Sequence, residues 1–158
     1  MYIHTHGIKG DPVIILLHPM GITGEKMYEV LGSKFSGTYF FITPDMGGHG
    51  SEKRPFRSAK AEAAALHNYL QQRGFTHILL LYGASLGCAV SLHLLAYGDL
   101  NIEHIFLDGA PVARLGFAMR KIFAPVNQKS RVQKTVSRSV ISMDCHMHFL
   151  SRSYFLAP

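Results

Sequence analysis

The chain is poor in cysteine and has no long apolar run. Its 158 residues include two cysteines, Cys88 and Cys145, which lie far apart in the sequence, so a disulfide framework is not indicated. No stretch approaches the roughly 20 apolar residues that a membrane-spanning helix needs. The N-terminus also lacks the basic lead and apolar core of a signal peptide. We therefore expect a cytoplasmic protein with one folded domain.

Acidic residues are scarce only in the last third of the chain. Residues 1–110 hold eight Lys and Arg against nine Asp and Glu, whereas residues 111–158 hold eight against Asp144 alone, within a total net charge of +6. This basic tail shows no RNA-binding signature and no zinc-finger spacing, and its aromatic residues are not regularly interleaved with the basic ones. The pattern argues against a nucleic-acid partner.

The most informative motif is Gly83-Ala84-Ser85-Leu86-Gly87. It follows an apolar stretch, Ile78–Tyr82, and precedes an apolar helical stretch, Leu86–Tyr97. A five-residue pattern with three fixed positions also occurs by chance, but this placement is the one that a nucleophile elbow requires. The glycines two residues before and after Ser85 would remove side chains that collide across so sharp a turn. The motif predicts that Ser85 is a nucleophile on a strained backbone.

Strand-like and helix-like segments alternate through the first two thirds of the chain, which predicts an α/β fold with a mainly parallel sheet and helices on both faces. We expect strands at Tyr2–His6, Val13–Leu17, Tyr39–Thr43, Ile78–Tyr82 and Ile102–Leu107, and helices at Thr23–Phe35, Ala59–Arg73 and Leu86–Tyr97. Residues 1–111 would form this core. Residues 112–158 lose periodicity, apart from a short basic helix expected at Leu115–Phe123.

Two further motifs stand at the ends of earlier strands: His18-Pro19-Met20-Gly21 and Asp45-Met46-Gly47-Gly48-His49-Gly50-Ser51. Together with the motif around Ser85, they resemble the α/β-hydrolase family, most of all its small esterase, lipase and acyl-transfer members. The resemblance implies that Ser85 attacks a carbonyl carbon. It also implies that the backbone amides of Met20 and Leu86 form the oxyanion hole.

The two histidines of these motifs carry different expectations. By the resemblance, His18 organises the oxyanion loop and is not a base, while a histidine merely exposed at a strand end is the open alternative. His49 is expected to be structural, because it lies in a glycine-rich turn.

The acid and the base that a serine hydrolase needs are harder to assign. Asp108 closes the strand after the elbow helix and is a candidate acid, although a role in capping the Leu-Asp-Gly-Ala-Pro turn is favoured. His146 and His148 are weak candidates for the base, and with Cys145 they could also ligate a metal, although a chance surface pair is favoured. We expect no metal and no cofactor.

The tail does not match the part of the family fold that should follow, so we expect a core truncated at its C-terminal side. Residues 112–158 would then be a lid remnant or non-native sequence, read out of frame beyond about residue 128. The leading hypothesis is a serine hydrolase of the carboxylesterase, lipase or thioesterase type, acting on a small ester or thioester. The alternative is an inactive hydrolase-like core that serves as a binding or assembly module. Either form could dimerise through an open sheet edge, without membrane or nucleic-acid partners.

Overall fold

The computed structural model describes residues 1–109. Within them the strands are β1 (Tyr2–His6), β2 (Val13–Leu17), β3 (Phe40–Asp45), β4 (His77–Ala84) and β5 (Asn101–Asp108). The helices are α1 (Gly24–Val30), the short 3₁₀ helix η1 (Gly32–Lys34), α2 (Ala59–Arg73) and α3 (Leu86–Leu95). The expected basic tail, residues 112–158, and its expected helix at 115–123 lie outside the described residues.

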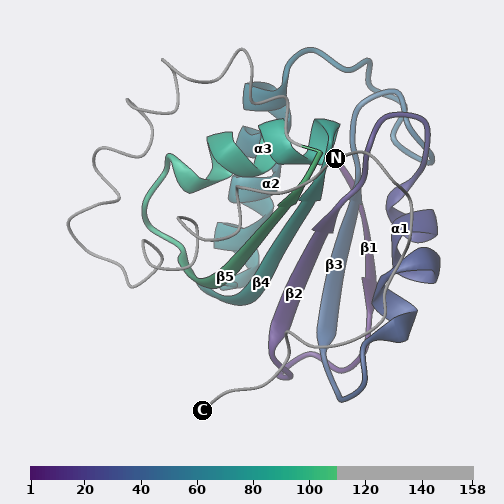
Figure 1. Cartoon of the computed structure of the whole chain (residues 1–158). Coiled ribbons are helices and arrows are strands. Elements are labelled where there is room, and N and C mark those ends of the chain that lie inside the picture. The colour runs from purple at the N-terminus through teal and green to yellow at the C-terminus, as the bar shows by residue number, and fades with distance from the viewer. Residues whose placement is uncertain (110–158) are drawn as a thin grey trace.

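The described strands form one mostly parallel sheet in the order β1-β3-β2-β4-β5. Only β1 runs antiparallel to its neighbour, β3, while β2, β3, β4 and β5 are parallel to one another. Their arrowheads point to the same end of the sheet in Figure 1. Parallel strands of this kind are covered on both faces, and β2 is buried along its whole length, as its continuous β-branched and leucine sequence predicts.

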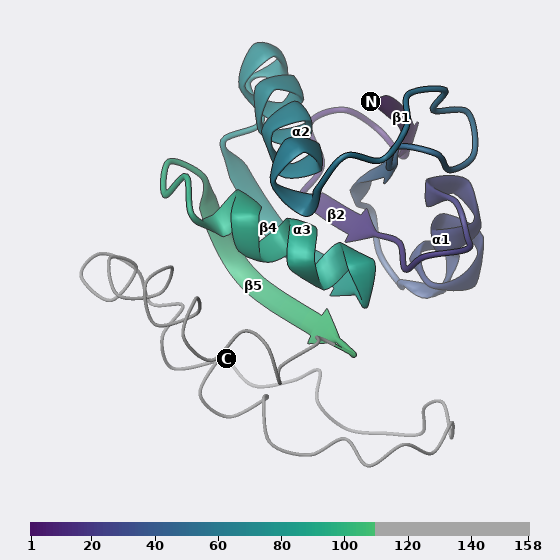
Figure 2. The same ribbon diagram turned by 90° about the horizontal axis from the view of Figure 1, so that it is seen from above.

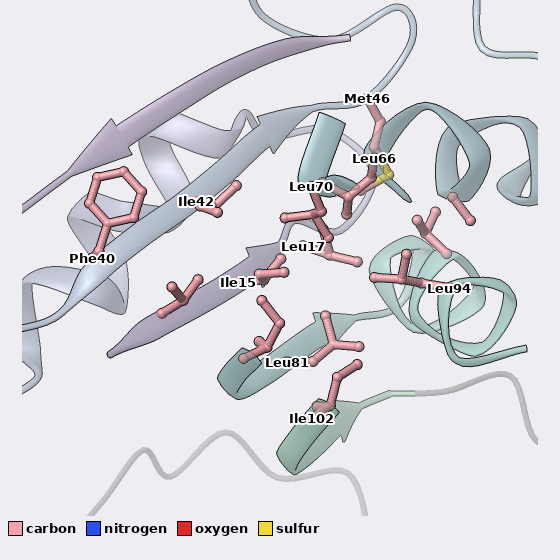
Figure 3. Close-up of a cluster of buried hydrophobic side chains, with 14 residues drawn as sticks. Ile15, Leu17, Phe40, Ile42, Met46, Leu66, Leu70, Leu81, Leu94 and Ile102 are labelled. Carbon is pink, nitrogen blue, oxygen red and sulfur yellow. The ribbon is translucent and has the colours of Figure 1, made fainter. Parts of the chain in front are cut away.

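Helices cover both faces of the sheet (Figure 2). On one face, α2 and α3 pack on the central strands around the cluster drawn in Figure 3, which includes Leu17, Leu66 and Leu94. On the other face, α1 packs through Met27 onto Ile14, Leu16 and Phe41. The expected α/β architecture is therefore present, and the core lies on both sides of β2.

The first helix is shorter than the expected Thr23–Phe35. Thr23 caps its start by accepting a 3.1 Å hydrogen bond from the Lys26 amide, but α1 ends at Val30 and continues only as η1. At Gly32 a Cβ atom would lie 2.5 Å from the Tyr28 ring, and the Ser33 hydroxyl bonds back to the Glu29 carbonyl. Glycine and serine are also weak helix formers, so the helix breaks here.

The strands β1 and β2 have the expected bounds, and β3, β4, β5 and α3 differ from expectation by one or two residues at their ends. The helix α2 has the expected bounds: Ser58 caps its start, and Gly74, with φ 74°, ends it in the left-handed conformation. The third helix ends at Leu95 and not at Tyr97, and β3, β4 and β5 extend beyond the predicted strands. None of the helices within residues 1–109 has the length and apolar character needed to cross a membrane.

Candidate active site

Ser85 occupies a sharp turn between the end of β4 and the start of α3. Its backbone has φ 46° and ψ −102°, and it is the one non-glycine residue with positive φ among residues 1–109. Such a conformation costs an L-residue roughly 1–3 kcal/mol and persists only where the surroundings enforce it. Ser85 is exposed. The expected strained strand-to-helix turn is therefore present.

The two glycines of the motif allow the turn to close. A Cβ atom on Gly83 would lie 2.5 Å from the Ser91 hydroxyl oxygen and 2.7 Å from the Gly87 carbonyl oxygen. A Cβ atom on Gly87 would lie 2.3 Å from the carbonyl oxygen of Leu17. Because these neighbours are mostly backbone atoms, only glycine fits at either position. The start of α3 thus packs directly on the end of β2.

The three strand ends around Ser85 are adjacent in the sheet. Leu17 pairs with Gly83, and Ala84 pairs with Asp108. The loop that carries Met20 therefore begins beside the turn that carries Ser85, at the carboxyl edge where open α/β sheets bind ligands. Met20 is 73% exposed. Leu86 is the first residue of α3, and the first amides of a helix have no partner within it.

Cys88 lies beneath the turn and supports it. Its thiol donates to the carbonyl oxygens of Gly83 at 3.0 Å and Asp108 at 3.2 Å, and its amide donates to the Ser85 carbonyl oxygen at 3.0 Å. Burial, reinforced by the Asp108 charge, raises the pKa of the thiol to about 11. Cys88 is thus a small buried side chain, and its thiolate is disfavoured as a nucleophile.

His18 is completely buried, so the alternative of a histidine exposed at the strand end is wrong. Its Nδ1 donates to the Pro19 carbonyl oxygen at 2.8 Å, and its Nε2 accepts from the Met46 amide at 3.1 Å. These partners fix the neutral tautomer. Burial lowers the pKa of His18, with a smaller contribution in the same direction from nearby His49. A neutral ring joining two backbone segments is suited to organising a loop.

His49 is half-buried in the glycine-rich turn after β3. Its Nδ1 lies 3.0 Å from the Gly47 carbonyl oxygen, and its ring centroid lies 4.9 Å from that of His18. The contact with Gly47 is local to the turn, whereas the contact with His18 joins the turn to the loop after β2.

Asp108 lies at the end of β5, next to the elbow, and its carboxylate accepts a 3.0 Å hydrogen bond from the Tyr82 hydroxyl. Burial, together with the Asp108 charge, raises the pKa of Tyr82, so this phenol stays protonated and donates. Sequence reasoning did not identify Tyr82 as a partner, although it stands three residues before Ser85 on the strand paired with β5. The other acidic residues after Ser85 within residues 1–109 pair elsewhere: Asp99 with His67 and Glu103 with His77.

The histidines of residues 1–109 that form side-chain hydrogen bonds do so with groups other than the Ser85 hydroxyl. The candidate bases His146 and His148, the neighbouring Cys145 and the acidic Asp144 all lie outside the described residues. A cavity of about 650 Å³ lies at the opposite end of the sheet, against Val13, Phe75 and His77, and is not part of the Ser85 region.

Comparison with known proteins places this geometry in a family. The sequence profile of the alpha/beta hydrolase fold matches residues 12–133. Lipase 3 of Moraxella sp. (strain TA144) is 27% identical over 110 residues, which are 68% of this chain and 34% of that lipase.

Two solved structures show the same fold. An esterase from Exiguobacterium antarcticum has a TM-score of 0.58 and 26% identity over 69% of this chain and 41% of its own. An alpha/beta hydrolase family protein from Desulfitobacterium hafniense has a TM-score of 0.65 at 20% identity, over 78% of this chain and 51% of its own. The chain thus spans between a third and about half the length of these three relatives. On the profile match and the shared fold, this chain belongs to the α/β hydrolase family.

Proposed function

We propose that the protein is a serine hydrolase that cleaves a small carboxylic ester or thioester through an acyl-enzyme on Ser85. The observation that carries the proposal is the exposed residue Ser85 on a turn with φ 46°, between the end of β4 and the first turn of α3. Strain of this kind is maintained where a side chain has to be presented. The esterase and lipase similarities support the same reaction class.

The chemistry follows from the atoms at the turn. The Ser85 oxygen would bond to the substrate carbonyl carbon while its proton passes to a general base, and the resulting oxyanion would accept hydrogen bonds from the amides of Leu86 and Met20. Collapse of this intermediate would release the alcohol or thiol with a proton and leave the acyl group on Ser85. Water would then attack the acyl carbon, release the carboxylic acid and restore the serine.

The remaining members of a triad are part of the proposal. We assign the acid to Asp108, because it ends the strand next to the elbow, and the base to His146 or His148. The core would comprise residues 1–111 and the tail residues 112–158. We also propose a cytoplasmic location, which imaging of a fluorescent fusion of the full chain would test.

Labelling with a fluorophosphonate tests the nucleophile directly. The Ser85 oxygen would bond to phosphorus and displace fluoride, so the full chain should gain the mass of the adduct on the peptide containing Ser85. The Ser85→Ala variant should gain none, and a Ser91→Ala variant should label normally, because Ser91 is buried and bonds to the Gly87 carbonyl. Absence of labelling on folded wild-type protein would reject the proposal.

A second candidate function is a catalytically silent core that acts in assembly. It is favoured by the edge strand β5, which pairs on one side only within residues 1–109 and carries Phe106 with 48% of its surface exposed. An unpaired edge beside apolar surface is a template for pairing with a second copy. Light scattering on the full chain should then give the mass of a dimer, and Phe106→Lys should shift it to a monomer. A monomeric wild-type protein would exclude this candidate.

A further inference from the structure

The loop of residues 18–24 runs from the end of β2 to the first residue of α1, and each of its ends is hydrogen-bonded to one of two consecutive residues, Asp45 and Met46, at the end of β3. At its start, His18 Nε2 accepts from the amide of Met46 at 3.1 Å. At its end, the amide of Gly24 donates to Asp45 Oδ1 at 2.7 Å, and this bond is buried. Met20, whose amide is the expected oxyanion donor, lies between these two attachments.

The Asp45 carboxylate is completely buried and has several partners. Besides Gly24 on Oδ1, its Oδ2 accepts from the Ser51 amide at 2.8 Å and lies 3.0 Å from His4 Nε2. Burial alone would raise the pKa of Asp45, but the hydrogen bonds from Ser51, His4 and Gly24 outweigh burial and lower it. The carboxylate is therefore held in its charged form, and it accepts a hydrogen bond from each of these partners.

The backbone around Asp45 is shaped to admit this carboxylate. A Cβ atom on Gly50 would lie 2.2 Å from Asp45 Oδ2, and a Cβ atom on Gly24 would lie 2.3 Å from the Thr43 carbonyl oxygen. Two segments thus approach the end of β3 more closely than any side chain would allow. The Asp45 carboxylate therefore does more than close its own turn, because it joins residues 24 and 51 to the edge strand β1.

His4 connects the carboxylate to the edge of the sheet. It stands on β1, its Nε2 faces Asp45, and its Nδ1 lies 3.2 Å from Glu25 Oε2 in the first turn of α1. His6, two residues along the same strand, places its Nε2 3.2 Å from the same Glu25 oxygen. A single carboxylate of α1, that of Glu25, therefore contacts two histidines of β1, next to the end of the loop.

We propose that Asp45, held in place by His4, is a positioning residue that fixes the loop of residues 18–24 and so aims the Met20 amide at the oxyanion. The structural half of this inference, that Asp45 fixes the loop, depends on the hydrogen bonds alone. The catalytic half, that the fixed loop aims the Met20 amide at the oxyanion, rests on the proposed function. An oxyanion donor works because it is fixed before the reaction, and small misplacements of such groups are costly.

Hydrogen exchange on the full chain tests the structural half without any activity. In Asp45→Ala, amides of residues 18–24 should exchange faster, whereas those of α2 should not change. Asp45→Asn should restore slow exchange in the loop, because its amide oxygen can still accept from Gly24. Unchanged exchange in Asp45→Ala would overturn the inference. If Asp45→Ala does not fold, hydrogen exchange in His4→Ala tests the inference instead. This variant leaves the Gly24 and Ser51 bonds in place, so exchange in the same loop should rise by a smaller amount.

Fluorophosphonate kinetics test the catalytic half. Losing one oxyanion donor costs about 10²–10³ in rate, so Asp45→Ala should lower the maximal labelling rate by roughly 10–100-fold and His4→Ala by roughly 3–10-fold. The half-saturating probe concentration should stay near the wild-type value, because neither substitution changes Ser85 or its turn. Asp45→Asn should recover most of the rate.

The matched control is His67→Ala. His67 also pairs with an aspartate, Asp99, at 2.9 Å, but between α2 and the connection from α3 to β5. A loss of labelling equal to that of His4→Ala would show a general stability effect and overturn the proposal. If wild-type protein is not labelled at all, the proposed function fails, while the exchange experiment still decides the role of Asp45.

Discussion

The backbone amide of Ser85 donates a 2.7 Å hydrogen bond to the carbonyl oxygen of Asp108. The same carbonyl also accepts from the Cys88 thiol at 3.2 Å. The Ser85 amide is thus occupied by the neighbouring strand. We infer that it is not an oxyanion donor in this conformation, which leaves that role to Leu86 and to the loop of residues 18–24.

Ser85→Gly should make the protein more stable while removing the hydroxyl. Glycine adopts φ 46° without strain, and relief of roughly 1–3 kcal/mol exceeds the roughly 0.5–1 kcal/mol entropic cost of a glycine. We expect a net gain of about 1 kcal/mol in the free energy of unfolding by urea. Ser85→Ala keeps the strained backbone and should gain much less. Equal stability of the two variants would contradict the strain.

Gly87→Ala should destabilise the protein although alanine is the better helix former. The new Cβ would lie 2.3 Å from the Leu17 carbonyl oxygen, so α3 would have to move away from β2. We expect a loss of about 1–3 kcal/mol, as for other overpacked sites. Urea unfolding with an unchanged m-value measures it. Ala89→Gly, two residues along the same helix, should cost only about 1 kcal/mol.

Cys88 should resist alkylation in the native protein. The thiol is buried and its pKa is raised to about 11, so at pH 8 the reactive thiolate is a small fraction. Iodoacetamide followed by peptide mapping distinguishes Cys88 from Cys145, and Cys88 should react only after denaturant is added. Rapid modification under native conditions would show that the thiol is accessible and that the turn opens readily.

Glu52 should make stability depend on acid pH. The Met1 ammonium at 2.8 Å, with a smaller contribution from Arg54, lowers the pKa of Glu52 from 4.5 to about 2. A lowered carboxyl pKa stabilises the fold above the unfolded value, and this stabilisation is lost as pH falls from about 4.5 through about 2. Glu52→Gln should therefore be less stable than wild type at pH 7 and nearly equal to it at pH 2.

The control for this titration is Glu29→Gln, because Glu29 forms an exposed pair with Lys26 at 2.7 Å. Exposed pairs contribute little, so its stability should follow wild type at both pH values. A constant difference between Glu52→Gln and wild type from pH 7 to pH 2 would contradict the role of the charge.

Much of the fold and the elbow was predictable, since both depend on local sequence. The apolar run at Val13–Leu17 indicates a buried strand, and the glycines flanking Ser85 indicate a tight turn whatever lies around them. The end of α1 at Val30 was not predictable. The helix ends where Gly32 lies against the Tyr28 ring, and the periodicity of the sequence does not show this contact.

The network around Asp45 was missed for a similar reason. The sequence showed a polar turn after a strand, and His4 is 41 residues away from its partner. The alternation of His4 and His6 on one strand face was the available signal, but nothing local says that β1 lies beside β3 and α1. Pairings that depend on strand order become visible only in the folded sheet.

The register that pairs Leu17 with Gly83 joins positions 66 residues apart in the chain. Long-range pairing of this kind is slow, because the entropy of closing the intervening chain is lost before the contact forms. During synthesis the ribosome must therefore release the chain through β5 before the turn at Ser85 has all its neighbours. We expect Ser85 to acquire its strained backbone geometry late in folding, after the central strands have joined.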